Sequence, residues 1–326
     1  MIITRTPFRI SFAGGGSDLR EYYSKYDASV LSVTINKYVF LSMHPYFNQN
    51  GYFLKYSKNE LVESVNSIEH KIIRQIFGDY KIKGVDFNSS ADIPAGTGLG
   101  SSSAFTSGLI TLCNAYTSKY MSPKNVAEHA CSIEIDKLKE PIGKQDQYSC
   151  TFGGMNFIRF FQDDTVGVEK IVMNSKKRLE LENNLLMFYL GTTRSARSVL
   201  TEQKTNTVKN VDSIKFLKKI VTLSEALKYE LQVGNIDALG DVLHSGWNYK
   251  KELASQITNE TIDYYYDLAL KNGATGGKLL GAGGGGFLLF YVVGEKQDAV
   301  RAALQDLDEL PFEFDNEGTK VIYYDN

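Results

Sequence analysis

The sequence predicts an α+β protein of two domains, and three observations lead to this fold class. The chain has 326 residues, which is more than one average domain needs. Its hydrophobic and charged fractions, 43% and 23%, are ordinary for a globular protein. Both halves place strand patterns in pairs beside consecutive helical patterns, which favours α+β over a doubly wound sheet. We expect domains at residues 1–170 and 171–326, with the boundary inside the polar stretch 162–182.

In the first half, β-branched and aromatic runs predict strands, and apolar runs that follow cap residues predict helices. Pro7 indicates an edge or a bulge in the first strand. Ser122 followed by Pro123 is typical of a helix start, and that helix should end before Pro141. The expected elements are strands at 2–12, 28–43, 85–87 and 153–161, and helices at 102–116 and 123–139.

The second half opens with an apolar strand and continues with three helical patterns. Two strands then flank a glycine cluster, and the chain ends as a helix followed by a strand. The expected elements are a strand at 185–190, helices at 212–233, 235–255 and 259–272, and strands on both sides of 281–286.

Charge and cysteine content exclude several classes of protein. Lys and Arg number 36 against 38 Asp and Glu, so no basic surplus exists to neutralise a nucleic-acid backbone. Cys113, Cys131 and Cys150 lie far apart, which favours buried thiols over a disulfide framework or a zinc site. The longest apolar run, about eight residues near Phe287, is far shorter than the roughly 18 needed to cross a bilayer. We expect a cytoplasmic protein without a secretory signal, a membrane partner or a nucleic-acid partner.

A glycine–serine segment at 94–104 predicts a phosphate site. Its glycines stand at a spacing of two and permit positive φ, so that backbone N–H groups can approach an anion closely. A helix then begins at the serines, and its N-terminus offers further unpaired N–H groups. The Walker loop is absent because Gly-Lys-[Ser/Thr] does not occur. The alternative, a flexible connector, fits poorly between a strand and an apolar helix. The expected ATP-binding residues are Pro94, Gly96, Gly98, Leu99, Gly100, Ser101, Ser102 and Ser103.

Two carboxylates downstream are candidates for chemistry. Glu134 continues an apolar helical stripe through Ala127 and Ala130, where a carboxylate is costly unless it is paired or metal-bound. Asp146 follows twelve residues later, at the expected start of another helix. Spacing alone leaves open whether Asp146 is only a capping residue. A kinase needs both a magnesium ligand and a carboxylate that orients or deprotonates the attacking hydroxyl, so the phosphate loop favours catalytic use.

Three segments, at 7–18, 94–104 and 278–287, together resemble the GHMP kinase family, which includes galactokinase, homoserine kinase and mevalonate kinase. The resemblance implies an N-terminal ribosomal-protein-S5-like domain and a C-terminal ferredoxin-like α/β sandwich domain. The third segment also fits G-x-G-x-x-G. It precedes a strand instead of opening a helix, so we expect a glycine-rich hairpin that packs against the first loop.

The resemblance also implies residue roles and the cofactors ATP and Mg²⁺. Ser102 and Glu134 match the family's magnesium-binding residues, and Asp146 matches the catalytic base of galactokinase. Arg9 matches an arginine beside that base, and Asp18 matches an aspartate that binds sugar hydroxyls. The expected substrate residues are Asp18, Gly15, Gly16, Ser17, Arg20, Arg194, Gly283 and Gly284.

One departure from galactokinase bears on the substrate. Gly15 and Gly16 replace a Glu-His pair that meets the far end of the hexose, so we expect open space for a longer or phosphorylated sugar. Within the family, the segments look most like D-glycero-D-manno-heptose 7-phosphate kinases, which make the 1,7-bisphosphate precursor of GDP-heptose. Arg20, Arg194 and Arg197 are candidates to bind a substrate phosphate, with solvated surface arginines as the alternative.

Two other interpretations remain. The same motifs are close to those of L-fucokinase, another sugar 1-kinase. A non-catalytic sensor of sugar and ATP would keep the fold, although Arg9, Ser102, Glu134 and Asp146 are all present. A family decarboxylase is disfavoured because the sugar-type N-terminal motif is intact. The expected partners are a small sugar phosphate and ATP. A homodimer is compatible with the sequence, which specifies no oligomeric state.

Overall fold

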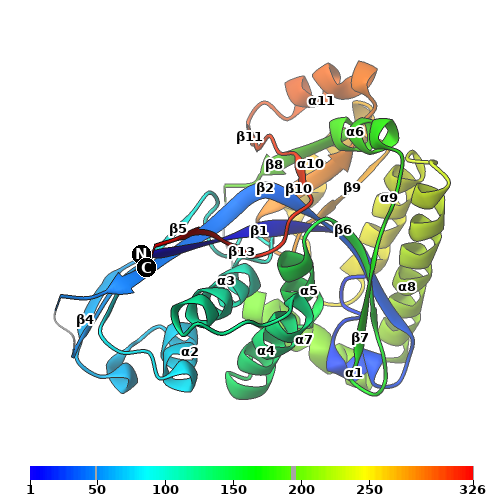
Figure 1. The fold of residues 1–326 in the computed structure, drawn as a ribbon. Coiled ribbons are helices and arrows are strands. Elements are labelled where there is room, and N and C mark those ends of the chain that lie inside the picture. Colours follow the sequence, from blue (N-terminus) through cyan, green and yellow to red (C-terminus); the bar gives the residue numbers. More distant parts are fainter. Residues whose placement is uncertain (48–49, 192–195, 326) are drawn as a thin grey trace.

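The computed structural model describes residues 1–47, 50–191 and 196–325 and confirms the α+β architecture (Figure 1). It contains two sheets. Across the described residues, the larger sheet has nine strands and follows the order β13-β1-β2-β5-β3-β4, while β6, β7 and β12 join it beside this path. The smaller sheet has the order β11-β8-β10-β9. Helices cover the faces of both sheets, so each sheet has a buried side.

The centre of the larger sheet is the antiparallel pair β1 (Ile2–Ala13) and β2 (Ala28–Pro45), as expected. Their register shifts between Pro7 and Arg9, so the bulge predicted from Pro7 is confirmed. Proline has no N–H for the ladder, which explains a break at this position. Arg9 N instead donates to Leu99 O at 3.1 Å. The bulge therefore connects β1 to the glycine–serine loop.

The remaining strands of this sheet come from distant parts of the chain. β3 pairs in parallel with β5, and the other pairs are antiparallel. These strands are β3 (Tyr52–Lys55), β4 (Asn59–Val62), β5 (Val85–Ala91), β6 (Met155–Phe160), β7 (Val166–Lys170), β12 (Phe314–Asp315) and β13 (Lys320–Tyr324). β12 pairs with β2 and β13 pairs with β1, so both termini lie together (Figure 1). The domain boundary at residue 170 stays a prediction. The last two strands of the chain, β12 and β13, belong to the larger sheet.

Helices from the first half pack on one face of the larger sheet. They are α2 (Lys71–Tyr80), α3 (Ser101–Tyr116), α4 (Pro123–Cys131) and α5 (Gln145–Phe152), and the short α1 spans Arg20–Tyr23. α3 contacts both β1 and β2. Ser122 Oγ accepts a hydrogen bond from Asn125 N at 3.3 Å, which confirms the predicted cap. α4 continues into a π-helical segment, η2 (Ser132–Lys137), and ends before Pro141 as expected.

The second half builds the smaller sheet and a further layer of helices, close to the predicted ranges. Its strands are β8 (Leu185–Tyr189), β9 (Gly276–Leu279), β10 (Phe287–Tyr291) and β11 (Asp308–Glu309). Its helices are α6 (Ser175–Asn183), α7 (Ala196–Lys209), α8 (Val211–Gln232), α9 (Ala238–Lys251), α10 (Glu260–Lys271) and α11 (Gln297–Ala303). The sequence did not predict α7. Its buried positions Val199, Gln203 and Thr207 fall four residues apart but are mostly polar, so no apolar stripe marks the helix.

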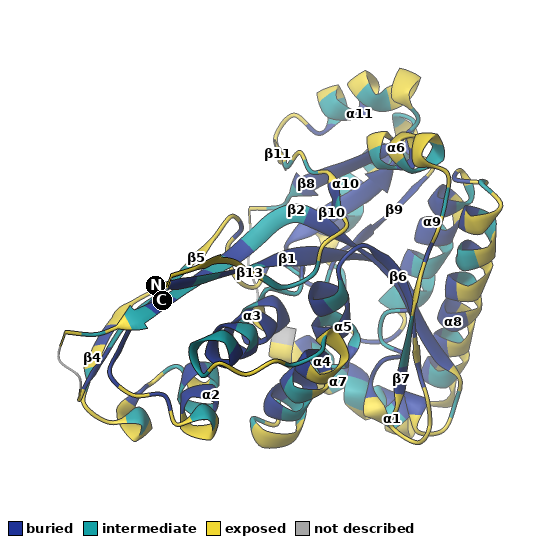
Figure 2. Ribbon diagram, in the orientation of Figure 1, coloured by how far each residue is buried: buried dark blue, intermediate teal, exposed yellow. Residues whose placement is uncertain are grey.

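The core runs between the two sheets and holds them together (Figure 2). Leu41 on β2, Leu109 on α3, and Met187 and Leu289 on the smaller sheet belong to one continuous cluster of buried side chains. All three cysteines are buried, as predicted. Among the described residues, none of the helices has the length and hydropathy needed to cross a membrane. The shared core fixes the loops of both sheets relative to each other at the edge where the candidate site lies.

Candidate active site

The glycine–serine loop between β5 and α3 has the backbone that was predicted for it. Gly96, Gly98 and Gly100 have φ values of 81°, 88° and 78°. A second glycine loop joins β9 to β10 and packs directly on the first. A Cβ atom on Gly98 would lie 2.4 Å from Leu280 O, and one on Gly281 would lie 2.3 Å from Gly98 Cα. The expected glycine-rich hairpin against the first loop is confirmed.

We expect Gly98→Ala to lower both the melting temperature and the affinity for ATP. A Cβ there strains a positive φ and meets the backbone of the facing loop, which must shift. The cost should be about 1–3 kcal/mol, measured by denaturant unfolding, with ATP affinity measured by calorimetry. Gly78→Ala within α2 is the control, because nothing lies within 4 Å of its Cβ and helix propensity favours alanine. A wild-type melting curve and wild-type ATP affinity for Gly98→Ala would contradict the close packing.

The N-terminus of α3 opens into a cavity of about 350 Å³. Gly100 is the N-cap and provides no side-chain cap, so the first N–H groups of the helix, at Ser101, Ser102 and Ser103, are available to an anion. Both glycine loops, the loop after β1, α5, α7 and α9 contribute to its wall. The cavity therefore combines an anion site with surfaces from both halves of the chain.

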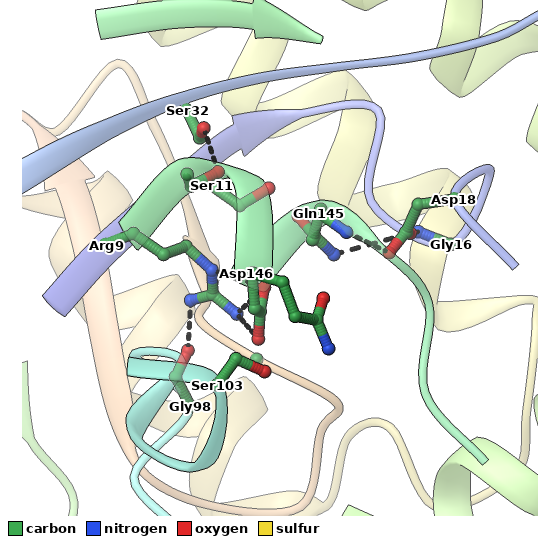
Figure 3. A network of polar contacts seen from close by, with 12 residues as sticks. Arg9, Ser11, Gly16, Asp18, Ser32, Gly98, Ser103, Gln145 and Asp146 are labelled. Atoms are coloured by element: carbon green, nitrogen blue, oxygen red, sulfur yellow. Dashed lines mark hydrogen bonds and ion pairs between the residues drawn. The ribbon is translucent and has the colours of Figure 1, made fainter. Parts of the chain in front are cut away.

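Arg9 ties a carboxylate to the glycine–serine loop. Its Nε and Nη2 donate to the two carboxylate oxygens of Asp146, each at 2.7 Å, and its Nη1 donates to Gly98 O at 2.7 Å (Figure 3). The Arg9 side chain is 4% exposed, whereas Asp146 keeps 24% of its side chain accessible. Asp146 Oδ2 lies 3.4 Å from the ideal Cβ position of Gly100. The bidentate pair thus holds an accessible carboxylate beside the loop.

Asp18 lies across the cavity, in the turn after β1 (Figure 3). Its carboxylate accepts hydrogen bonds from Gly16 N at 2.9 Å, Gln145 N at 3.2 Å and Gln145 Nε2 at 3.4 Å. Burial raises the pKa of this carboxyl, and the charge of Asp146 raises it further, while the backbone donors act in the opposite direction. Gly143 has no side chain because a Cβ would lie 2.0 Å from Asp18 Oδ2. The backbone around Asp18 is therefore shaped to hold this carboxylate.

Glu134 lies behind the serines, fully buried on η2. It accepts hydrogen bonds from Ser102 Oγ at 2.6 Å, Ser103 Oγ at 2.8 Å and Gln147 Nε2 at 2.8 Å. All three donors are uncharged, and burial raises the pKa of Glu134 despite them. The one-residue widening of a π-helical turn re-aims this side chain relative to a regular helix.

The pair Ser102 and Glu134 offers oxygen ligands of the kind that Mg²⁺ prefers. Among the described residues, no group of three or more His, Cys, Asp or Glu could hold a metal ion alone. Magnesium commonly binds through one or two carboxylates together with substrate phosphates, so a site completed by a nucleotide fits this donor set. A cation would also neutralise the buried carboxylate of Glu134, whose present partners carry no charge.

The structure brings most of the predicted site residues together. Those that line the cavity are Arg9, Gly15, Gly16, Asp18, Gly96, Gly98, Gly100, Ser101, Ser102, Ser103, Asp146 and Gly283. Others support its wall from behind. Ser17 Oγ donates to Ser29 O, Pro94 O accepts from Thr97 Oγ1, Leu99 O accepts from Arg9 N, and Gly284 N donates to Ile257 O. The catalytic and binding roles of these residues stay predictions.

The predicted phosphate-binding arginines fare differently. Arg20 does not line the cavity, because its guanidinium pairs with Asp136 at 2.9 Å and Asp164 at 3.4 Å on the outer surface. Arg197 lines the cavity and lies 3.6 Å from Glu140. Arg194 lies outside the described residues. The structure therefore brings only Arg197 of these three to the cavity within the part of the chain it describes.

The paired glycines do not both leave open space, which corrects the expectation for Gly16. A Cβ on Gly16 would lie 2.4 Å from Gln203 Nε2, so the amide of Gln203 on α7 occupies that position. Around Gly15 the nearest atoms to a Cβ are Gln145 Nε2 and Ser11 Oγ, each at 3.7 Å. A Cβ at Gly15 would thus make only ordinary van der Waals contacts, whereas one at Gly16 would require Gln203 to move.

Six polar cavity residues escaped the sequence prediction: Ser11, Glu140, Gln145, Gln203, Lys250 and Lys278. Lys278 lies between Gly277 and Leu279 on β9, directly before the glycine hairpin. A lysine at this position could have been predicted to lie near the site. Lys250 gave none, because Lys250 and Lys251 adjoin at the end of α9 and only the fold decides which faces the cavity. Gln203 lies on the helix that was not predicted.

Comparison with known families matches both halves of the chain. A model described as "GHMP kinases N terminal domain" matches residues 66–154, and one described as "GHMP kinases C terminal" matches residues 226–310. Together they span more than half of the sequence and include the glycine–serine loop, Asp146 and the second glycine loop. Two of the three family segments seen in the sequence, 94–104 and 278–287, lie within these matches, and the segment 7–18 lies outside them.

Similar proteins carry related names. The chain is 29% identical to a D-glycero-alpha-D-manno-heptose 7-phosphate kinase of Campylobacter jejuni, over 98% of both chains. It is 28% identical to a bifunctional fucokinase/GDP-fucose pyrophosphorylase of Arabidopsis thaliana, over 68% of this chain and 21% of that one. A solved structure described as a D-glycero-D-manno-heptose 1-phosphate kinase from Bacteriodes thetaiotaomicron superposes with a TM-score of 0.81 at 25% identity and covers 100% of both chains.

Proposed function

The chain belongs to the GHMP kinase family and is a sugar kinase, and we propose that it phosphorylates the anomeric hydroxyl of D-glycero-D-manno-heptose 7-phosphate with ATP. The product would be the 1,7-bisphosphate. One observation carries this choice of chemistry: Arg9 holds the accessible carboxylate of Asp146 against the glycine–serine loop, with Asp18 across the same cavity. A hydroxyl placed between the two aspartates would face a phosphate bound on the loop.

Each residue then has a defined task. The loop N–H groups and the N-terminus of α3 bind the ATP phosphates, since both offer donors to an anion. Asp18 accepts hydrogen bonds from sugar hydroxyls and sets the orientation of the ring. Asp146 takes the proton of the anomeric hydroxyl as that oxygen bonds to the γ-phosphorus in line, and the bond to ADP breaks with its electron pair leaving on ADP. Arg9 keeps the Asp146 carboxylate in place throughout.

Magnesium fits this scheme through Ser102 and Glu134. When bound there with ATP, it would neutralise charge on the nucleotide phosphates. Ser103 and Gln147 hold Glu134 in position through hydrogen bonds at 2.8 Å each, so they orient this ligand.

The choice of a heptose 7-phosphate draws support from the likeness to the Campylobacter jejuni enzyme and from the absence of a side chain at Gly15, which lines the cavity. The Bacteriodes thetaiotaomicron structure is instead described as a heptose 1-phosphate kinase, a name in which the substrate phosphate is at the anomeric position. A 1-phosphate has no free anomeric hydroxyl, so that substrate would require attack by another oxygen. The likeness to a fucokinase supports L-fucose as a second candidate acceptor.

The purified protein should turn over ATP with D-glycero-D-manno-heptose 7-phosphate at a kcat/KM at least about 10-fold above that for any unphosphorylated sugar, since a charge-assisted contact contributes about 1.5–3 kcal/mol. The assay measures ADP release with heptose 7-phosphate, heptose 1-phosphate, free heptose, L-fucose and D-galactose, and ³¹P NMR locates the new phosphate. Preferred turnover of L-fucose, or of the 1-phosphate, would refute the substrate. Sugar binding without ADP release for every compound would favour the sensor.

A further inference from the structure

Two lysines line the cavity and have no acidic partner among the described residues. Lys250, on the last turn of α9, donates through Nζ to the carbonyl oxygen of Gly281. Lys278, on β9, donates to the carbonyls of Ser11 at 2.9 Å and Phe12 at 3.2 Å, and is 7% exposed. Backbone carbonyls are uncharged, so the hydrogen bonds of these two lysines do not neutralise a positive charge on either one.

The charge balance of the wall shows what these lysines face. In the part of the chain that the structure describes, seven ionisable residues line the cavity: Arg9, Asp18, Glu140, Asp146, Arg197, Lys250 and Lys278. Four are basic and three acidic, and Arg9 pairs with Asp146 while Arg197 lies 3.6 Å from Glu140. Asp18 alone is left against two lysines.

The pKa values of both lysines show the cost of this arrangement. Burial lowers the pKa of Lys250 to about 8, and the charge of Arg9 lowers it further, whereas Asp18 and Asp146 raise it. Burial, Lys250 and Arg9 hold the pKa of Lys278 well below its usual range. An anion bound beside these two amines would favour their charged forms, because it would offset both their burial and their mutual repulsion.

An unused donor belongs to Ser11, the residue whose carbonyl accepts from Lys278. The Ser11 hydroxyl is buried, lines the cavity and has no hydrogen-bond partner among the described residues. It lies 3.7 Å from the ideal Cβ position of Gly15, which also lines the cavity and carries no side chain. The carbonyl of the same residue holds Lys278. Hydroxyl and ammonium groups are the donors that a phosphate uses.

We propose that Lys250 and Lys278, with the Ser11 hydroxyl, bind the phosphate that the sugar substrate already carries. The inference rests on the proposed function and specifies how the same cavity distinguishes a sugar phosphate from a free sugar. It assigns to two lysines the task that the sequence had offered to Arg20, Arg194 and Arg197. The guanidinium of Arg20 is engaged by Asp136 and Asp164 outside the cavity, and that of Arg197 lies 3.6 Å from Glu140. The ATP phosphates have their own donors at the loop and at α3.

Calorimetry without ATP tests the assignment, with D-glycero-D-manno-heptose 7-phosphate and the unphosphorylated heptose as probes. Lys250→Gln and Lys278→Gln should each weaken binding of the 7-phosphate by roughly 10- to 100-fold, the range for one charge-assisted contact. Binding of the free heptose should change less than about twofold, because this sugar carries no phosphate for the lysine to contact. Lys251→Gln is the matched control, since Lys251 is the next residue of α9 and pairs with Asp263 at 3.8 Å, outside the cavity.

Equal weakening for both probes, or unchanged binding of the 7-phosphate, would overturn the inference. So would a loss in kcat or in ATP affinity with normal sugar-phosphate binding, which would place the lysines at the transferred phosphoryl group. Because Lys278 also joins β9 to β1, its variant is scored only with a wild-type melting curve, and Lys250→Gln carries the test otherwise. Wild-type protein that binds the 7-phosphate but releases no ADP would refute the proposed function alone.

Discussion

Asp146→Asn should lower kcat by roughly 10²- to 10⁴-fold, the usual contribution of a general base, while ATP affinity stays at the wild-type value. The amide has the size of the carboxylate but cannot take a proton from the sugar hydroxyl. Asn also keeps one oxygen that can accept a bond from Arg9, and Arg9 retains its bond to Gly98 O. The phosphate loop should therefore hold its shape. A coupled assay of ADP release gives kcat, and calorimetry gives the affinity for ATP.

The control for this variant is Asp241→Asn, an exposed aspartate in the first turn of α9. It removes the same charge from the same kind of helical position and should leave kcat unchanged. Near-normal turnover of Asp146→Asn would rule out its role as the base. A matching loss in ATP affinity would show instead that Asp146 supports the loop through Arg9.

Much of the fold could be predicted because its signals are local. Pro7 cannot donate to a ladder, and a bulge occurs there. Ser122 caps a helix through its own hydroxyl. Gly98 and Gly100 need positive φ, and no tertiary information is required to see that they permit it. At each of these positions, the residue type and its immediate neighbours are enough to predict the local backbone structure.

Other features depend on contacts between distant segments, and sequence reasoning missed them. α7 is held by its neighbours and not by an apolar stripe, so its residue Gln203 could not be placed beside Gly16 in advance. The pairing of β13 with β1 joins the two ends of the chain, which no local pattern encodes. Lys250 enters the cavity only because α9 packs against β9 and β1. The predicted phosphate ligand Arg20 lies outside the cavity because it pairs with two residues distant in sequence, Asp136 and Asp164.

Glu134→Gln should separate catalysis from stability. We expect kcat to fall by about 10²-fold or more, because a Lewis-acid metal contributes several kcal/mol and the glutamine amide is a poor replacement for a charged ligand. The Mg²⁺ concentration that gives half-maximal activity should rise. Glu63→Gln, at an exposed position, is the control and should change neither quantity.

Glu134→Gln should lower kcat but raise the stability of the metal-free protein. The pKa of Glu134 is raised in the folded state above its ordinary value of 4.5, so the folded protein favours the protonated carboxyl. That contribution to stability is complete below about pH 4.5 and is lost as the pH rises through the raised pKa. Glutamine has no proton to lose, and its Oε1 can still accept from Ser103 Oγ and Gln147 Nε2 while its Nε2 donates to Ser102 Oγ. In EDTA, the melting temperature of Glu134→Gln relative to wild type should therefore increase as the pH rises.

The two measurements together distinguish a metal ligand from a structural carboxylate. A purely structural Glu134 would give a variant whose stability falls at every pH and whose Mg²⁺ requirement is unchanged. A metal ligand that is costly to bury predicts a variant that is at least as stable without metal at neutral pH, yet nearly inactive with it. Added Mg²⁺ and ATP should then stabilise the wild type more than the variant, because only the wild-type carboxylate gains a cation that offsets its burial.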